Sequence, residues 1–419
     1  MTAPLQVFKF GGASLRDPGA IRQVARIISA AQTGPLVIVV SAMGKTTNAL
    51  EAIWKARLAH EQVHQLLHDL ILFHAQIVRE VFPEPQRLMT EIERILEQQS
   101  SPKPEGMEAD RYYDQVVVAG ELVSSLIVSE FLRLQGIEVV LHDARDFVVT
   151  DNAHREAAVD WTATRKRISG IRFPDSGIVV TQGYIGSTAE GASTTLGRDG
   201  SDFSAAIFAT SLGASAVTIW KDVPGVMNAD PKRIPDAIVF PELPYQEAAE
   251  MTYYGASVIH PKTIKPLANR SIPLKVRSFE DPSLPGTLIH ECRVDRLPPL
   301  IVFKEHQCLI SCKVTDYTFV TEDQLKVIFG LIAAARVRIN VMQNSAISFS
   351  FCVDFREDKI LALIESLSGP FEVYYNTGLT LITVKNYTEA LRQQYSSLPA
   401  VLLEQSSRST MQVLVRMDH

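Results

Sequence analysis

The chain has few cysteines, no excess of positive charge and no long apolar run, and each shortage excludes a class of protein. Four cysteines in 419 residues are too few for the disulfide framework of a small secreted domain. A formal charge of −6 offers no broad basic field for nucleic acid or an anionic membrane. The longest apolar runs, such as residues 36–40 and 116–119, are far shorter than the ~20 residues of a membrane span. Positive charge for a polyanionic ligand must therefore be local.

The cysteines and histidines show no spacing typical of a metal site, and no metal-ligating residue is predicted. Cys308 and Cys312 are spaced C-x3-C without a second Cys or His pair nearby, so we expect buried thiols on one face of a strand. His60, His64 and His68 recur at every fourth position and are expected to form a solvated or packed helix face. Glycines follow the first ten residues, unlike a signal peptide, so the chain is expected to be cytoplasmic.

The first part of the chain alternates between strand and helix patterns, which is typical of a parallel α/β sheet. Buried strands are expected at residues 5–10 and 36–40, and a helix over 17–31 with Asp17 as N-cap and Pro18 at its first position. Residues 49–99 are rich in Leu, Ile, Gln and Glu and indicate a helical subdomain. Further strands are expected at 115–119, 138–142, 178–183 and 216–220, with helices at 120–135, 160–169 and 201–212.

Prolines and a glycine between residues 281 and 299 mark a break, beyond which the pattern changes. Residues 307–375 show the order β-α-β-β-α-β of a ferredoxin-like unit, and a second, shorter unit follows with strands at 379–384, 400–403 and 410–416 and a helix at 388–396. The predicted domains are residues 1–292, with a helical insert at about 49–110, and two ferredoxin-like units at 298–376 and 377–419. Small units of this kind behind a larger domain indicate a regulatory, ligand-binding part.

Six polar segments lie where strands and helices are expected to meet, which is where open α/β sheets bind ligands. In residues 9–14 (KFGGAS) the glycines let backbone N–H groups approach phosphate oxygens, although a tight strand-to-helix turn is the alternative. Glu121 is either a first-turn acid favoured by the helix dipole or a group that binds a substrate ammonium. The other segments are 41–48 (SAMGKTTN), 120–125 (GELVSS), 194–202 (TTLGRDGSD), 220–232 (WKDVPGVMNADPK) and 253–261 (YYGASVIHP).

In this order, the six segments resemble the aspartate kinases of the amino-acid kinase superfamily. The resemblance covers residues 5–290, and the C-terminal units look like the family's ACT domains. It implies a three-layer α/β sandwich with a helical insert, followed by tandem ferredoxin-like ACT units. The implied reaction transfers the γ-phosphoryl group of ATP, with Mg²⁺, to the β-carboxylate of L-aspartate, the first step towards lysine, threonine and methionine. No dinucleotide fingerprint follows, so a monofunctional enzyme is expected.

The resemblance also implies roles for individual residues. The β-carboxylate, with an ordinary pKa of ~3.9, is already ionised, so catalysis needs positioning and charge neutralisation rather than a general base. Lys9 is implied to stabilise the transferred phosphoryl group, and Asp202 to orient Lys9 or a Mg²⁺-bound water. The implied aspartate-binding residues are Thr47, Glu121, Arg198 and Ser201. The implied nucleotide-binding residues are Lys9, Gly11, Gly12, Ser41, Lys221, Asp222, Met227, Lys232, Ser257 and Val258.

Two departures from the family pattern concern charge. Position 257, often lysine in the family, is Ser257, and Lys221 or Lys262 could compensate. Asp199 adds a negative charge that costs little if it is exposed to solvent.

In the C-terminal units, Asn344 and Ser345 are the implied ligands of an effector amino acid, lysine or threonine, with a plain polar turn as the alternative. Because ACT units usually pair across subunits, a homodimer or larger assembly is expected. Two other functions remain open: another carboxylate kinase of the superfamily, or a catalytically weak regulatory protein that binds amino acids.

Overall fold

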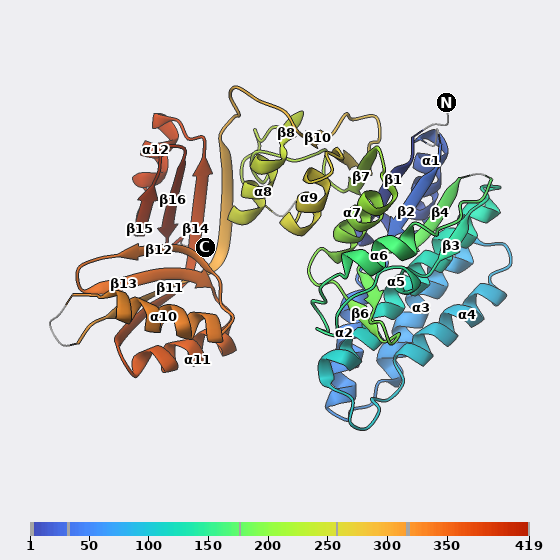
Figure 1. Cartoon of the computed structure of the whole chain (residues 1–419), viewed down its shortest axis with the longest axis horizontal. Helices are drawn as coiled ribbons and strands as arrows, with labels where there is room; N and C mark the ends of the chain where they lie inside the picture. The colour runs from blue at the N-terminus through green and yellow to red at the C-terminus, as the bar shows by residue number, and fades with distance from the viewer. Residues whose placement is uncertain (1–3, 32–33, 176, 257–258, 316–318, 418–419) are drawn as a thin grey trace. The chain divides into compact units, whose positions relative to one another are not determined.

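The computed structural model describes residues 4–31, 34–175, 177–256, 259–315 and 319–417 (Figure 1). Its contacts divide the chain into two compact units. The first unit consists of Met1–Val226, Val239–Thr252 and Ser257–Val294, and the second of Met227–Ile238, Tyr253–Ala256 and Asp295–His419. Two short segments ahead of residue 292 therefore pack with the C-terminal unit.

The first unit is built on an eight-stranded sheet with the strand order β3-β4-β2-β1-β7-β9-β10-β8. The strands from β3 to β9 are parallel to their neighbours, whereas β10 runs antiparallel to β9. All five residues of β2 (LVIVV) are buried, as expected for a strand covered on both faces. The strands are β1 (Gln6–Phe10), β2 (Leu36–Val40), β3 (Val140–His142), β4 (Ile178–Gln182), β7 (Ala216–Lys221), β8 (Glu242–Pro244), β9 (Leu274–Ser278) and β10 (Thr287–His290). A small hairpin adds β5 (Ile185–Ser187) and β6 (Ser193–Thr195).

Helices cover both faces of this sheet, which gives the three-layer α/β sandwich that the sequence predicts. Alternate residues of β1, Phe8 and Phe10, pack in one core with residues of α1 and α5, whereas α7 contacts β1, β2 and β7. The helix predicted over 17–31 is confirmed, because Asp17 accepts a hydrogen bond of 2.8 Å from the Ala20 N–H at the start of α1. The helices are α1 (Pro18–Ala31), α2 (Thr46–Leu58), α3 (His64–Val81), α4 (Gln86–Gln99), α5 (Ala109–Leu134), α6 (Trp161–Ile168), α7 (Gly200–Leu212), α8 (Tyr245–Tyr254) and α9 (Pro261–Ala268), with 3-10 turns η1 (Gly12–Leu15) and η2 (Ala144–Asp146).

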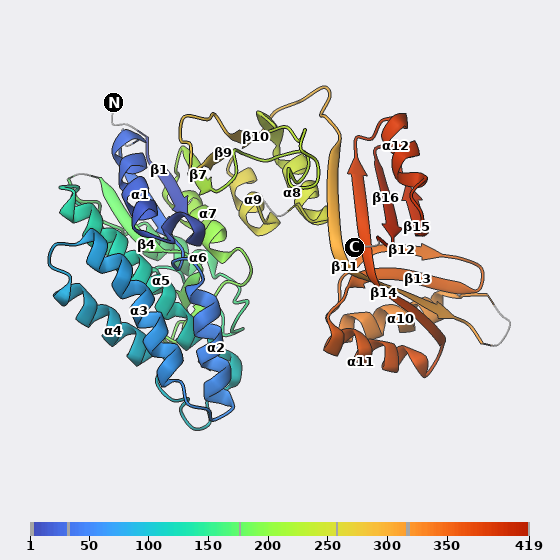
Figure 2. The same cartoon turned by 180° about the vertical axis from the view of Figure 1, so that it is seen from behind.

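The predicted helical subdomain consists of α2, α3 and α4, of which α2 and α4 pack against α5 and α3 packs against α4 (Figures 1 and 2). The expected histidine stripe is interrupted, because His60 has a positive φ of 58° and lies in the turn before α3. His64 and His68 do share an exposed face of α3, and their rings stack with centroids 6.3 Å apart.

The strand predicted at 115–119 is wrong, whereas the helix predicted over 120–135 is confirmed but begins earlier, at Ala109. Both segments belong to α5, a helix of 26 residues. Because α5 is buried on nearly every side, its apolar residues show no helical periodicity, and the run 116–119 resembles a strand. Helix α5 is also long and apolar enough to cross a membrane, but 78% of its apolar window is buried inside the protein, as in the core helix of a globular fold.

The second unit is a six-stranded antiparallel sheet with the order β12-β13-β11-β14-β16-β15. Cys308 and Cys312 lie buried in one apolar cluster with Ile310, which confirms the predicted structural thiols on β11. The elements are β11 (Leu300–Lys313), α10 (Glu322–Ala334), β12 (Ile339–Asn344), β13 (Ser348–Asp354), α11 (Glu357–Ser368), β14 (Glu372–Lys385), α12 (Glu389–Ser396), β15 (Val401–Ser406) and β16 (Thr410–Val415).

The two long central strands, β11 and β14, serve both ferredoxin-like units. Residues 309–313 pair with 372–376 in the first unit, whereas 300–304 pair with 381–385 in the second. The strands predicted separately at 371–375 and 379–384 are thus one strand, and the strand predicted at 307–314 begins at Leu300. A register shift between Lys304 and Gln307 separates its two halves. The shorter, second unit therefore takes one of its strands from residues 300–304, which come before the first unit in the sequence.

Candidate active site

The site is assembled at the carboxyl ends of parallel strands in the first unit. Lys9 lies one residue before the end of β1 and pairs in register with Val39 of β2 and Ile219 of β7. Ser41 follows β2 directly, and Lys221 is the last residue of β7. Neighbouring parallel strands end at the same edge of a sheet. These three residues belong to separate sequence motifs but therefore lie close together at this edge.

A buried carboxylate with two ammonium partners forms the centre of the site. Asp202, in the first turn of α7, is 3% exposed; its Oδ1 lies 2.6 Å from Lys9 Nζ and its Oδ2 lies 3.3 Å from Lys221 Nζ. Burial alone would raise the pKa of Asp202, but the charges of Lys9 and Lys221 outweigh it and hold that pKa below its usual value. The three side chains together carry one net positive charge. This is the kind of local positive charge that a polyanionic ligand needs on a chain with no broad basic field.

Glu121 enters the same neighbourhood from the middle of α5. It is buried, its Oε1 accepts a hydrogen bond of 3.3 Å from the Ala42 N–H, and its buried Oε2 has no hydrogen-bond partner among the described residues. Burial raises the pKa of Glu121 to about 8, against the opposing effects of the hydrogen bond from Ala42 and the charge of Lys9. A buried carboxyl oxygen without a hydrogen-bond partner costs folding free energy, and a cationic partner at this atom would offset that cost.

The two glycine-containing loops after β1 and β2 are joined through their backbones. Gly44 N–H donates to Gly12 O at 3.0 Å, and Ser41 N–H donates to Phe10 O at 3.1 Å. A Cβ on Gly12 would lie 2.7 Å from the Ala42 oxygen, so only glycine allows this approach. The backbone of Gly11, the preceding residue of this turn, also lies close to the Lys9 ammonium group. Thr47, half-buried, follows in the first turn of α2.

Several predicted residues do not join this cluster. The Arg198 side chain is 80% exposed and lies 3.6 Å from Asp199, which is itself exposed and has a positive φ of 54°. Asp222 is exposed, whereas Ser201 is largely buried in the first turn of α7 beside Asp202. The predicted nucleotide ligands Met227 and Lys232 belong to the second unit.

Two predicted nucleotide ligands, Ser257 and Val258, lie outside the described residues. Of the two lysines that could compensate for Ser257, Lys221 belongs to the Asp202 cluster. Lys262 is exposed in the first turn of α9.

One buried group that sequence reasoning missed is Asp114 of α5. It accepts hydrogen bonds from Thr195 Oγ1 at 2.6 Å and from the Arg155 N–H at 3.1 Å, and it contacts His154 Nδ1 at 2.8 Å. Burial raises its pKa despite these hydrogen bonds. Thr195 ends β6 and leads to Arg198, so Asp114 anchors the segment that carries this arginine. The sequence signal that could have indicated it is a single acidic residue within the largely apolar stretch 112–119.

A second buried pair that the sequence did not indicate stands beside Thr47. Thr46 Oγ1 lies 3.3 Å from His74 Nε2, and burial lowers the pKa of His74 to about 4, so the ring is neutral at physiological pH. This contact ties the first turn of α2 to α3.

In the second unit, the implied effector residues form the turn between β12 and β13. Asn344 ends β12 and is exposed, and the Ser345 hydroxyl accepts from the Ser348 N–H at 3.2 Å. The turn between β15 and β16 repeats this arrangement, because Ser407 Oγ accepts from the Thr410 N–H at 3.1 Å.

Comparison with known proteins agrees with this architecture. Residues 4–278 match the Amino acid kinase family. Lysine-sensitive aspartokinase 3 of Escherichia coli (strain K12) is 32% identical, with 90% of this chain and 86% of that protein covered. The bifunctional aspartokinase/homoserine dehydrogenase 2 of Arabidopsis thaliana is 30% identical over 94% of this chain, which spans 45% of that longer protein.

The solved structure of E. coli aspartokinase III in complex with aspartate and ADP superimposes with a TM-score of 0.81 at 27% identity, covering 98% of this chain and 96% of that one. The match extends over both units. The chain therefore belongs to the amino acid kinase family and, within it, to the aspartate kinases.

Proposed function

We propose that the cluster of Lys9, Asp202 and Lys221 lies beside the γ-phosphoryl group of ATP and stabilises it during its transfer to the β-carboxylate of L-aspartate. The doubly paired Asp202 is the observation that carries this assignment, because it holds two ammonium groups at the strand ends. The attacking carboxylate is ionised at neutral pH, so no base has to remove a proton. Lys9 then neutralises charge on the phosphoryl oxygens, while Asp202 keeps both ammonium groups in position.

Aspartate would be held at its two other charged groups. The free Oε2 of Glu121 is placed to accept a hydrogen bond from the substrate ammonium. Arg198 would bind the α-carboxylate in bidentate fashion, exchanging its exposed ion pair with Asp199, which is worth little in water. The hydroxyl groups of Thr47 and Ser201 would complete the polar contacts.

The nucleotide phosphates would lie against the joined loops that contain Gly11, Gly12 and Ser41, where backbone N–H groups can approach them. The remaining nucleotide contacts proposed from the family pattern are Asp222, Met227, Lys232, Ser257 and Val258. Mg²⁺ would be coordinated by phosphate oxygens of ATP, because both oxygens of Asp202 already face ammonium groups. Asp202 is therefore unsuited to direct ligation of the metal.

Regulation by an effector amino acid is proposed for the ferredoxin-like units, with Asn344 and Ser345 as ligands. Lysine is the first effector to test, since the E. coli relative is described as lysine-sensitive. The enzyme would act in the cytoplasm as a homodimer or larger assembly joined through these units.

A coupled assay of ADP release tests the substrate assignment. We expect turnover with ATP and L-aspartate, and little or none with L-glutamate or N-acetylglutamate. Turnover with another carboxylate instead of aspartate would assign the site to a different kinase of the superfamily. Saturable lysine binding without turnover of any of the three substrates would overturn the kinase assignment in favour of a regulatory protein.

A further inference from the structure

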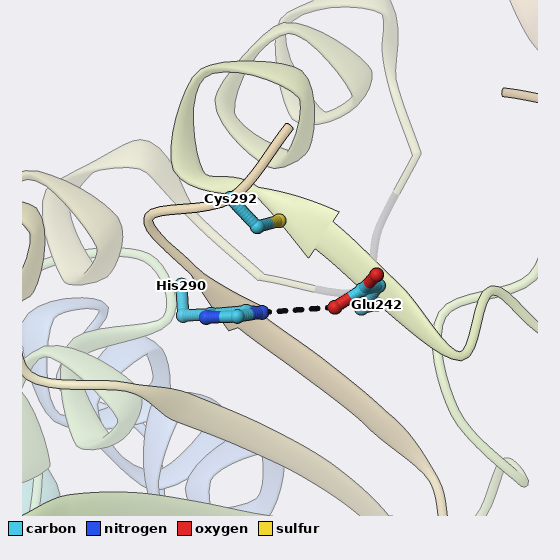
Figure 3. A group of neighbouring side chains, drawn as sticks. All are labelled: Glu242, His290 and Cys292. Carbon is cyan, nitrogen blue, oxygen red and sulfur yellow. Dashed lines mark hydrogen bonds and ion pairs between the residues drawn. The ribbon is translucent and has the colours of Figure 1, made fainter. Parts of the chain in front are cut away.

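Three side chains with metal-binding atoms converge at the edge of the first unit's sheet, on strands that take no part in the Lys9 cluster. They are Glu242 of the edge strand β8, His290 at the end of β10, and Cys292 two residues later (Figure 3). Their carboxylate, imidazole and thiol atoms all lie within 4.8 Å of one another.

Strand pairing explains why these side chains meet. Strands β8 and β10 are parallel, and Glu242 stands opposite Leu288. Alternate residues of a strand share one face, so His290 projects on the same side as Leu288 and therefore as Glu242. His290 Nε2 lies 3.1 Å from Glu242 Oε2, and Figure 3 shows the Cys292 thiol beside this pair.

We propose that Glu242, His290 and Cys292 form a binding site for a divalent transition-metal ion of the Zn²⁺ type. One sulfur, one nitrogen and one oxygen donor match the ligands that Zn²⁺ takes from proteins, and three protein ligands leave a fourth position for water. Bonds of about 2.0–2.3 Å in a tetrahedral site separate ligand atoms by roughly 3.3–3.8 Å. The His290 Nε2–Glu242 Oε2 distance of 3.1 Å lies just below this range, and the widest separation, which is within 4.8 Å, has to close by at most about 1 Å.

The surroundings of the cluster favour a cation. Burial raises the pKa of the Cys292 thiol, and the negative charges of Glu242 and Glu291 raise it further; the same two carboxylates attract a cation. The cluster is also accessible, because the side chains of Glu242 and His290 are 49% and 30% exposed. An ion can therefore enter from solvent, and binding through sulfur releases the thiol proton to water.

Such an ion would join the edge strand β8 to the segment that follows β10. Val294 is the last residue of the first unit, two residues after Cys292. The ion would therefore hold the exit of the chain from this unit and stabilise its sheet edge by mass action.

The test uses the full-length protein, freed of metal by a chelator and titrated with Co²⁺ as a spectroscopic probe and Zn²⁺ as competitor. We expect a thiolate-to-cobalt absorption band with one equivalent of Co²⁺, and its loss when Zn²⁺ is added. The other cysteines should not contribute, because Cys308, Cys312 and Cys352 are buried, whereas Cys292 is partly exposed.

Cys292→Ser should abolish the band, and His290→Ala or Glu242→Gln should weaken Co²⁺ binding at least tenfold. His64→Ala, which removes an exposed histidine of α3, is the matched control and should leave the titration unchanged. Circular dichroism checks that each variant is folded, and a rise in Tm with Zn²⁺ should occur in the wild type but not in Cys292→Ser. A band that survives Cys292→Ser, or Co²⁺ binding without any thiolate band, would overturn the proposal.

Discussion

At the scale of single residues, Asp202 sets the charge balance of the active site. Both of its oxygens face ammonium groups, so we propose that it positions them rather than acting as a base. A buried carboxylate would be costly without these partners, and the lysines would be poorly oriented without the carboxylate.

Lys9→Met should lower kcat by about a hundredfold or more. The variant loses the ammonium charge that stabilises the transferred phosphoryl group, and such a charge is worth roughly 3–4 kcal/mol. Steady-state kinetics with aspartate and ATP measures the change. Lys55→Met, which removes an exposed lysine of α2, is the control and should leave kcat near the wild-type value. Normal turnover in a folded Lys9→Met protein would remove Lys9 from the mechanism.

Glu121 should make aspartate binding depend on pH. Its pKa of about 8 leaves the free carboxyl mostly neutral at pH 7, whereas the substrate ammonium needs the ionised form. The KM for aspartate should therefore fall as the pH rises from about 6 to about 8, with up to tenfold per pH unit. Glu121→Gln should raise this KM and flatten its pH profile, and an unchanged profile in the variant would exclude Glu121 from ammonium binding.

The same pKa shift predicts an independent effect on stability. The pKa of Glu121 in the folded chain lies above its ordinary value of 4.5, so its contribution to the free energy of unfolding is complete below pH 4.5. That contribution is lost as the pH rises towards about 8. Urea unfolding of the wild type and of Glu121→Gln over this range measures it without substrate: the difference between the two should change with pH.

At the scale of elements, α5 carries both Glu121, which lies against the loop after β2, and Asp114, which lies against the end of β6. Its Gly120 makes this approach possible, since a Cβ there would lie 2.9 Å from Ala42 Cβ and 3.1 Å from Thr46 Cγ2. In an ordinary helix, glycine costs about 0.5–1 kcal/mol relative to alanine. Here the close packing outweighs helix propensity.

Gly120→Ala should therefore destabilise the protein by about 1–3 kcal/mol, because the added methyl group forces the loop and helix apart. Gly330→Ala is the matched control in α10, where a Cβ would meet no atom within 4 Å, and it should gain about 0.5–1 kcal/mol. Denaturant unfolding followed by circular dichroism measures both. A stabilised Gly120→Ala protein would show that the loop yields without cost.

At the scale of the whole molecule, the catalytic sheet and the ferredoxin-like sheet divide transfer and proposed regulation between two units. The second sheet has an internal repeat, with a hairpin on each side of the central strands β11 and β14. Ser345 and Ser407 occupy matching turns in these hairpins.

Ser345→Asp should abolish inhibition by lysine while leaving activity without effector unchanged. An aspartate side chain can still accept the turn hydrogen bond from the Ser348 N–H, so the turn should persist while its added charge changes the effector site. Ser407→Asp makes the same change in the other hairpin and serves as the control. Kinetics at increasing lysine concentration decides, and equal inhibition of both variants and the wild type would place the effector elsewhere.

Sequence alone determined the features that depend on local patterns. The β-branched run of β2 and the Asp17-Pro18 start of α1 were predictable because strand burial and helix capping involve neighbouring residues. The aspartate kinase family was recognisable because its motifs are short and ordered, and they named Lys9, Asp202, Lys221 and Glu121.

Tertiary structure alone decided which distant residues meet. It placed Glu121 in the middle of a buried helix, where uniform burial removes the periodic signal, and it paired residues 300–304 with 381–385 to complete the second regulatory unit. It also brought His290 to Glu242, 48 positions away, through the parallel pairing of β8 and β10. Such contacts depend on strand order and register across the sheet, which no short stretch of sequence encodes.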